Sequence, residues 1–275
     1  MPTKTIPRIE MNLLLEGVYQ VYGYDFRDHA EASLHRRLNK WLSESPFSTF
    51  SEAQGIILRN PEAFHGLLKG LTVHVTEMFR DPAAFRVLRE LVVPHLRTYP
   101  FLKIWAAGCA TGEEAYSMAI LLEEEGFKDR YHIYATDIDP EILVHAKAGI
   151  YSLKEMQRFT QNYQLAGGKA GFSDYYTARF DRAMLEPRLR DRIVFSTHNL
   201  AADASFGDMH LTLCRNVLIY FKPILRQRVL ALLDESVVPG GFLGLGLKES
   251  LETTDCQRTY TEVSPRSRIY RKRYV

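Results

Sequence analysis

The segment from Gly108 to Ser117 constrains the fold of this chain more than any other. It follows an apolar run, residues 102–107, and it opens an amphipathic run that continues to Leu122. A strand that ends in small residues and then begins a helix brings bare backbone N–H groups close to a ligand. A second apolar run, residues 131–137, ends on Asp137, where an acidic side chain can accept both hydroxyls of a ribose. The sequence therefore predicts a nucleoside site in a doubly wound α/β fold.

The two glutamates after Gly112 indicate which nucleoside binds. Glu113 and Glu114 stand where a dinucleotide-binding turn would present its backbone amides to a pyrophosphate, and like charges repel at short range. S-adenosylmethionine carries an ammonium and a sulfonium group and has no phosphate, so an acidic turn attracts it. We predict S-adenosylmethionine as the cofactor. The alternative is that both glutamates only favour the N-terminus of a helix.

The composition is that of an ordinary globular protein, with 46% hydrophobic and 25% charged residues. The net charge of +2 gives no strong attraction to nucleic acid or membranes. Apolar runs fall short of the roughly 18 residues that a membrane span needs, and the N-terminus lacks a signal-peptide core. Three widely spaced cysteines argue for a reducing compartment and against a disulfide framework or a metal site. We therefore expect a cytoplasmic protein without membrane insertion and without a metal.

The periodicity of the chain changes between its two parts. Residues 8–90 have helical periodicity, whereas strands alternate with helices from Leu102 onward, which predicts a parallel sheet covered on both faces. The predicted domains are residues 1–90, helical with a linker, and residues 91–275, which bind the cofactor. We expect strands near residues 102–107, 131–137, 192–197, 209–214 and 242–247, and then a pair near 258–263 and 268–274.

One interval breaks this alternation. Between Asp137 and Arg192 lie 54 residues, too many for a single crossover helix. The part near residues 165–191 is rich in glycine, tyrosine and charge, so we expect a small inserted subdomain there.

Polar residues follow two further predicted strands. Asn199 and Leu200 follow residues 192–197, and Asn216 and Val217 end the run from Met209. Ligands of an open α/β sheet lie beyond the carboxyl ends of its strands, and an amide offers donors and an acceptor that suit adenine. Alternatively, each asparagine is a turn residue that satisfies its own backbone.

Two more segments bear on the site. Thr76 to Arg80 lies at the junction of the predicted domains, and the planar fork of Arg80 can pair with a carboxylate; the alternative is a surface arginine. Asp139 precedes Pro140 and is expected to cap a helix, which leaves Asp137 to face the ligand.

Four motifs in this order resemble the chemotaxis receptor methyltransferases, the CheR family. They are Thr76-x-x-Phe79-Arg80, residues 110–117, residues 135–139, and Cys214-Arg215-Asn216-Val217-x-Ile219-Tyr220-Phe221. The resemblance spans about residues 10–272. It implies S-adenosylmethionine-dependent methyl esterification of glutamate side chains on cytoplasmic receptor helices for sensory adaptation, with S-adenosylhomocysteine as product. It also implies a Rossmann-like class I methyltransferase sheet, a helical N-terminal domain and a small inserted β-subdomain.

The resemblance further implies the site residues. By position, the cofactor contacts would be His74, Thr76, Arg80, Glu114, Asp137, Asn199, Leu200, Asn216 and Val217. Arg80 and Tyr220 would lie nearest the methyl transfer and are the expected catalytic residues. Residues 246–250 depart from the Gly-His-Ser-Glu of many relatives, so we assign them no role.

A basic helix is the expected contact for the receptor. Arg36, Arg37 and Lys40 lie opposite an apolar stripe and would steer an acidic receptor helix toward the site. The stripe consists of Leu34, Leu38, Trp41 and Leu42. The alternative is a solvated face with local ion pairs to Glu31 or Glu44.

Two other functions stay open at this point. One is a module that binds the cofactor but acts as a sensor or scaffold in a signalling complex without methyl transfer. The other is a nucleic-acid methyltransferase, which the near-neutral charge and the lack of an Asn-Pro-Pro motif after the fourth strand disfavour. We expect a monomer that binds no nucleic acid.

Overall fold

The computed structural model describes residues 5–73, 75–252 and 254–274. The chain divides into two compact units. The first unit holds residues 1–73, 199–204 and 219–229, and the second holds residues 74–198, 205–218 and 230–275. The first unit is therefore built from segments that are far apart in the sequence.

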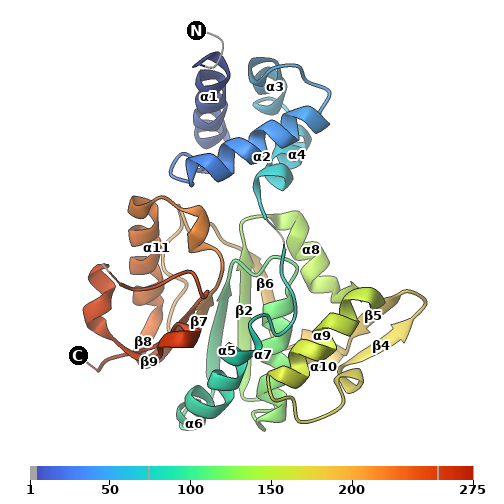
Figure 1. Ribbon diagram of the computed structural model, residues 1–275, viewed down its shortest axis with the longest axis vertical. Coiled ribbons are helices and arrows are strands. Elements are labelled where there is room, and N and C mark those ends of the chain that lie inside the picture. Colours follow the sequence, from blue (N-terminus) through green and yellow to red (C-terminus); the bar gives the residue numbers. More distant parts are fainter. Residues whose placement is uncertain (1–4, 74, 253, 275) are drawn as a thin grey trace. The chain divides into compact units, whose positions relative to one another are not determined.

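The first unit is helical. It contains α1 (Thr5–Tyr22), α2 (Glu31–Glu44), α3 (Phe50–Ile57), α4 (Pro61–Leu71) and the beginning of α11 (Pro223–Ser236) (Figure 1). Thr49 and Asn60 cap α3 and α4, because each side chain accepts a backbone N–H from the first turn of its helix. On α2, Leu34 and Leu38 of the predicted apolar stripe are buried, whereas Trp41 and Leu42 are half-buried.

Arg37 does not lie on the exposed basic face that the sequence suggests. Its guanidinium donates to the carbonyl oxygen of Leu71 and to Ser33 Oγ at 3.0 Å, and it lies 4.8 Å from the centroid of the Tyr220 ring. Arg36 and Lys40 are exposed, and Lys40 Nζ lies 3.8 Å from a carboxylate oxygen of Glu44. The expectation that all three cations form one exposed basic face is therefore wrong for Arg37, because helical periodicity alone does not reveal that the end of α4 approaches it.

The second unit is built on a seven-stranded sheet with the order β6-β2-β1-β7-β8-β10-β9. Its strands are β1 (Leu102–Ala107), β2 (Tyr131–Asp137), β6 (Ile193–Thr197), β7 (Met209–Cys214), β8 (Val237–Leu245), β9 (Tyr260–Ser264) and β10 (Ile269–Lys272). Five strands are parallel, whereas β10 and β9 run antiparallel at one edge, so the sheet is mixed. This arrangement confirms the predicted Rossmann-like class: the five parallel strands are those that alternate with helices, and the predicted final pair of strands forms the antiparallel edge.

Strand β8 begins earlier than the sequence suggests. Its first part contains Pro239, Gly240 and Gly241, which read as a turn, but the pairing with β7 shifts register here. Gly240 has a φ of 78°, which glycine adopts without strain. A bulge therefore lets the strand pass through these residues.

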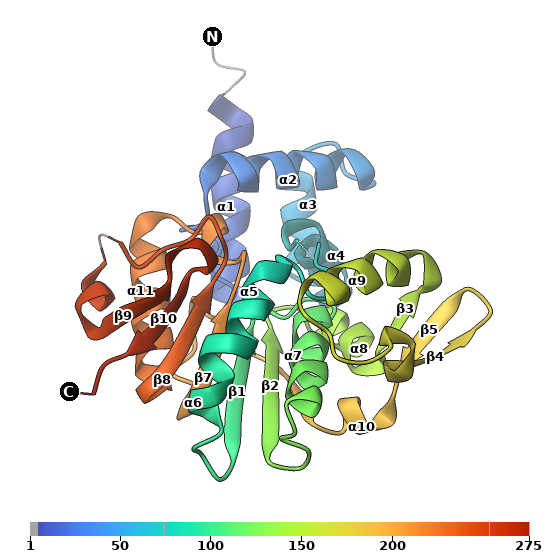
Figure 2. The same cartoon turned by 60° about the horizontal axis from the view of Figure 1, so that its bottom comes forward.

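Helices surround the sheet of the second unit. They are α5 (Pro82–Val87), η1 (Leu88–Val92), α6 (Val93–Leu96), α7 (Glu113–Glu124), α8 (Pro140–Ala148), α9 (Leu153–Leu165) and α10 (Pro187–Arg190), with short 3-10 turns at Phe172–Tyr175, Leu218–Tyr220, Asp255–Thr259 and Pro265–Ser267. Figure 2 shows α5, α6 and α7 along one face of the sheet. From Ala115 to Leu122, α7 is buried on every side, so it is a core helix rather than an amphipathic one.

A separate three-stranded antiparallel sheet completes the second unit. It has the order β3-β5-β4, from β3 (Ile150–Ser152), β4 (Tyr176–Arg179) and β5 (Arg182–Leu185). The predicted insertion near residues 165–191 holds β4 and β5, whereas β3 and α9 precede it. Three residues of β3 are too few to give a recognisable periodicity. In the part of the chain that the structure describes, we find no helix long and apolar enough to cross a membrane.

Candidate cofactor site

The turn between β1 and α7 lies at the switch point of the large sheet. Strands β1 and β7 are neighbours there, although β2 and β6 come between them in the sequence. The backbone N–H groups of Gly108 and Cys109 both donate to the carbonyl oxygen of Thr136 at 2.8 Å. A Cβ on Gly108 would come within 2.5 Å of Val217 Cγ2, so a larger residue would push the turn and Val217 apart. The predicted turn thus forms where ligands of this fold bind.

Asp137 ends β2 and braces this turn. One carboxylate oxygen accepts the N–H of Ala110 at 2.9 Å, and the other accepts the N–H of Asp139 at 3.2 Å. The side chain of Asp139 accepts N–H groups from the first turn of α8, which confirms its predicted role as a helix cap. Asp137 is 9% exposed and ends β2 at the carboxyl edge of the sheet, where this fold holds a ribose.

The two glutamates of the turn have different surroundings. Glu113 is buried against Thr111, whose hydroxyl lies 2.8 and 2.6 Å from the two carboxylate oxygens. Burial raises the pKa of Glu113 from 4.5 to about 7. Glu114 is more accessible and accepts a hydrogen bond from Arg215 at 2.7 Å. Of the two, Glu114 is the one placed to offer negative charge to a ligand.

Arg215 connects the turn to the segment that carries Arg80. Its guanidinium donates to Glu114 on one side, and on the other to the carbonyl oxygen of Arg80 at 2.9 Å and to Asp81 Oδ2 at 2.8 Å. Its side chain is 5% exposed and lies over the ring of Phe85. We did not single out this residue from the sequence, because its partners are more than 100 positions away.

Asn216 follows Arg215 with a φ of 62°. Its backbone N–H donates to Glu249 Oε2 at 3.0 Å, and the same oxygen accepts the N–H of Gly246 at 2.6 Å. The side-chain oxygen of Asn216 is buried and has no hydrogen-bond partner among the residues that the structure describes. Such an atom is suited to accept a hydrogen bond from a ligand. Glu249, to which we assigned no role, is 5% exposed and supports this loop.

The segment from Thr76 to Arg80 is tied to this turn by the backbone carbonyl of Arg80, which Arg215 binds. The guanidinium of Arg80 donates to the carbonyl oxygen of Val75 at 3.2 Å, and both Arg80 and Thr76 are half-buried. His74 lies outside the described residues. The neighbours of Arg80 have positive φ angles, 52° at Phe79 and 57° at Asp81. Four of the seven non-glycine residues with positive φ in the described part of the chain, these two with Ala110 and Asn216, lie in the loops just described. Backbone strain of this kind gathers at functional sites.

The remaining predicted site residues belong to the first unit. The side-chain oxygen of Asn199 accepts the N–H of Ala201 at 3.0 Å, which is the turn role considered as an alternative. Leu200 is buried. The carbonyl oxygen of Tyr220 accepts the N–H of Ala30 at 2.7 Å, and its ring packs under Arg37.

The second unit therefore brings together Arg80, Glu114, Asp137, Asn216 and Val217 on contiguous loops. These hydrogen-bond acceptors suit an adenosine with a cationic tail: Asp137 for the ribose hydroxyls, the buried oxygen of Asn216 for a donor on the ligand, and Glu114 for positive charge. Comparison with known proteins agrees with an S-adenosylmethionine site. The sequence model of the family described as "CheR methyltransferase, SAM binding domain" matches residues 74–266, and that of "CheR methyltransferase, all-alpha domain" matches residues 9–72. The chain belongs to the CheR methyltransferase family.

Named relatives match this chain over most of their own length. The chain is 47% identical to a Pseudomonas putida protein named Cher3, over 96% of this chain and 97% of that one. It is 34% identical to a chemotaxis protein methyltransferase of Vibrio anguillarum, over 82% of each chain. It is 30% identical to chemotaxis protein methyltransferase 1 of Pseudomonas aeruginosa, over 83% of this chain and 85% of that one. S-adenosylmethionine is the cofactor of this methyltransferase.

Proposed function

We propose that this methyltransferase esterifies glutamate side chains on cytoplasmic helices of chemotaxis-type receptors. Two of the relatives above are named as chemotaxis protein methyltransferases. The observation that carries the proposal is that the buried guanidinium of Arg215 fixes the backbone of Arg80 next to Glu114 at the start of α7. The Arg80 side chain therefore starts from a fixed point beside the cofactor turn, and a guanidinium placed there suits a carboxylate substrate.

In this proposal, Thr76, Glu114, Asp137, Asn199, Leu200, Asn216 and Val217 hold S-adenosylmethionine, together with Arg80, and His74 is assigned to the same group by its place in the motif. When bound, the cofactor would supply an activated methyl group on its sulfonium, with the neutral thioether of S-adenosylhomocysteine as the leaving group. The glutamate needs no general base, since its ordinary pKa of about 4.3 leaves it ionised at neutral pH.

The protein then has to align the carboxylate, and alignment alone can contribute on the order of 7–11 kcal/mol to the rate. Arg80 orients the carboxylate. Tyr220 donates a hydrogen bond from its hydroxyl to one carboxylate oxygen and leaves the other free to attack, and the Arg37 guanidinium lies against the Tyr220 ring. The exposed cations Arg36 and Lys40 steer the acidic receptor helix.

The runner-up is a sensor or scaffold that binds the cofactor without methyl transfer. Two measurements on the same preparation separate the proposals: calorimetric titration with S-adenosylhomocysteine, and transfer of labelled methyl to receptor fragments. Binding together with transfer supports the enzyme. Binding without transfer to any receptor fragment supports the sensor.

A further inference from the structure

The backbone groups of Met78, Phe79 and Arg80 form hydrogen bonds with side chains from three separate parts of the fold. The carbonyl oxygen of Met78 accepts Asn162 Nδ2 at 3.0 Å, and the N–H of Phe79 donates to Ser117 Oγ at 2.8 Å. The carbonyl oxygen of Arg80 accepts Arg215 Nη2 at 2.9 Å. Asn162 lies on α9, Ser117 on α7, and Arg215 follows β7. This segment is thus fixed from three sides.

The backbone needs this support. Arg80 stands between two non-glycine residues with positive φ, Phe79 and Asp81. Such conformations persist only where the surrounding structure enforces them. The side-chain hydrogen bonds to Met78, Phe79 and Arg80 provide that enforcement and fix where the Arg80 side chain begins.

Helix α9 contacts the segment from Glu77 to Phe79 through three side chains. The ring of Phe79 is fully buried and contacts Tyr163 of α9 edge to face, with 5.3 Å between ring centroids. Arg158, one turn before Asn162, pairs with Glu77 at 2.8 Å. Successive turns of one helix face therefore contact the segment through an ion pair, a hydrogen bond and an aromatic contact.

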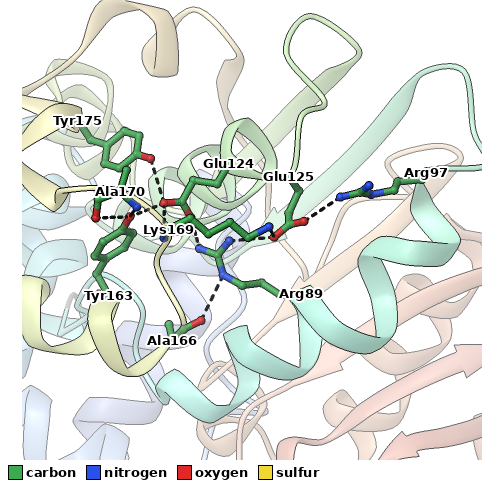
Figure 3. A network of polar contacts seen from close by, with 9 residues as sticks. All are labelled: Arg89, Arg97, Glu124, Glu125, Tyr163, Ala166, Lys169, Ala170 and Tyr175. Carbon is green, nitrogen blue, oxygen red and sulfur yellow. Dashed lines mark hydrogen bonds and ion pairs between the residues drawn. The ribbon is translucent and has the colours of Figure 1, made fainter.

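Helix α9 is itself anchored at both ends. It begins directly after β3 of the small sheet, where Ser152 and Glu155 form a capping box. At its other end, Figure 3 shows a polar network around Glu124 and Glu125 of the α7 end. Tyr163 and Arg89 bond to Glu124, and Arg89 also donates to the carbonyl oxygen of Ala166 at 3.2 Å. The side chains of Arg89, Glu124 and Glu125 are 6%, 3% and 6% exposed, so solvent screens these charges weakly.

We infer that α9, which leads from β3 of the small sheet into the inserted subdomain, is a positioning element for the active site, and that Asn162 is a positioning residue for Arg80. The inference rests on the proposed role of Arg80. It makes the small sheet and its helix part of the catalytic apparatus, because the helix that continues from β3 fixes the segment carrying Thr76 and Arg80. Asn162 acts through the backbone of Met78 and not by touching substrate or cofactor.

The test is Asn162→Asp, which keeps the shape of the side chain and replaces the N–H donor by an acceptor facing the Met78 carbonyl. The matched control is Gln161→Glu, the same amide-to-acid change at an exposed position of α9. We expect Asn162→Asp to weaken S-adenosylhomocysteine binding and to lower turnover, each roughly tenfold, while the Michaelis constant for the protein substrate stays within about twofold. Hydrogen exchange should become faster in peptides covering residues 75–82. Asn162→Ala, which adds no charge, should reproduce the direction of every change.

The outcomes separate this inference from the proposed function. Weaker cofactor binding and faster exchange in Asn162→Asp, with Gln161→Glu like wild type, supports the positioning role even if no receptor fragment is methylated. Wild-type affinity and turnover per folded molecule in both Asn162 variants overturns it, whether or not thermal stability falls. In that case Asn162 has a purely structural role.

Discussion

Arg215 and Glu114 lie 101 residues apart in the chain and meet at 2.7 Å, which ties the end of β7 to the first turn of α7. The same guanidinium reaches the backbone of Arg80. One side chain therefore sets the relative positions of a proposed cofactor contact and a proposed catalytic residue.

Arg215→Lys tests this connection. A lysine provides a single point of charge and cannot serve Glu114 and the Arg80 carbonyl together, so one buried partner loses its hydrogen bond. We expect a loss of about 1–3 kcal/mol in the free energy of unfolding and about tenfold weaker binding of S-adenosylhomocysteine. The measurements are thermal denaturation and calorimetric titration. Arg192→Lys is the control, because its pair with the exposed Asp129 is worth little. Unchanged affinity in Arg215→Lys would show that the bridge does not support the site.

Asp137→Ala should abolish measurable cofactor binding while the chain still folds. Each lost hydrogen bond to a charged acceptor costs roughly 1.5–3 kcal/mol, and the Ala110 turn loses its brace as well. The control is Asp139→Ala, which removes the cap of α8 and should cost about 1 kcal/mol of stability with affinity largely kept. Calorimetric titration of both variants with S-adenosylhomocysteine measures the affinities. Equal affinity in wild type and Asp137→Ala refutes the assignment of Asp137 to the ribose.

The strand ends that carry these residues could be predicted from the sequence. The runs at 102–107 and 131–137 are apolar and end in polar or small residues, and the structure has β1 and β2 with these bounds. The alternation of strand side chains and the capping of helices depend on a few neighbouring residues, so a local sequence pattern is enough to predict where β1 and β2 end.

The connections between the loops could not be predicted in the same way. Arg215, Glu249 and Asn162 each bond a partner that is distant in the sequence, and their own neighbourhoods do not reveal those partners, although Arg215 lies within a recognised motif. Arg37 is the converse: its helical position indicates an exposed face, but the end of α4 accepts its guanidinium. Side-chain partners of this kind depend on tertiary packing, which periodicity does not encode.

Tyr220→Phe should lower turnover at least tenfold and leave S-adenosylhomocysteine affinity nearly unchanged. A hydroxyl that bonds the carboxylate acts mainly in the transition state, and the ring remains under Arg37. Tyr19→Phe is the matched control, since Tyr19 also lies under an arginine of the first unit, Arg27, at 3.8 Å. Steady-state kinetics and calorimetry are needed together. An equal fall in affinity and turnover would make Tyr220 a binding residue.

Glu113→Gln should change how stability depends on pH. Burial raises the pKa of Glu113 from 4.5 to about 7 in the folded state, so the folded protein holds this proton more tightly than the unfolded chain. Stability from this group is therefore greatest below pH 4.5 and falls as the pH rises toward 7, by on the order of 3 kcal/mol.

The glutamine removes this loss. The variant should match wild type near pH 4.5 and exceed its stability at pH 8, as measured by urea unfolding across a pH series. The exposed Glu90→Gln serves as control. A constant difference between Glu113→Gln and wild type at all pH values would mean that Glu113 does not titrate in this window.

Changing Arg36 and Lys40 together to Ala should raise the apparent Michaelis constant for the receptor and flatten its salt dependence. Exposed charges at an interface act mainly on the association rate, so cofactor affinity should stay constant. Arg59→Ala with Lys69→Ala removes the same charge from exposed positions elsewhere in the first unit. Methylation across a salt series is the readout. If both double variants keep the wild-type slope, Arg36 and Lys40 belong to a solvated face.

The proposed product is a glutamate methyl ester on a receptor helix. The direct measurement is transfer of labelled methyl from S-adenosylmethionine to receptor cytoplasmic fragments, followed by mild base and by mass spectrometry of the labelled peptides. We expect label that base releases as methanol, located on glutamates and absent when those glutamates are replaced by alanine. Base-stable label, or label on residues other than glutamate, would contradict it.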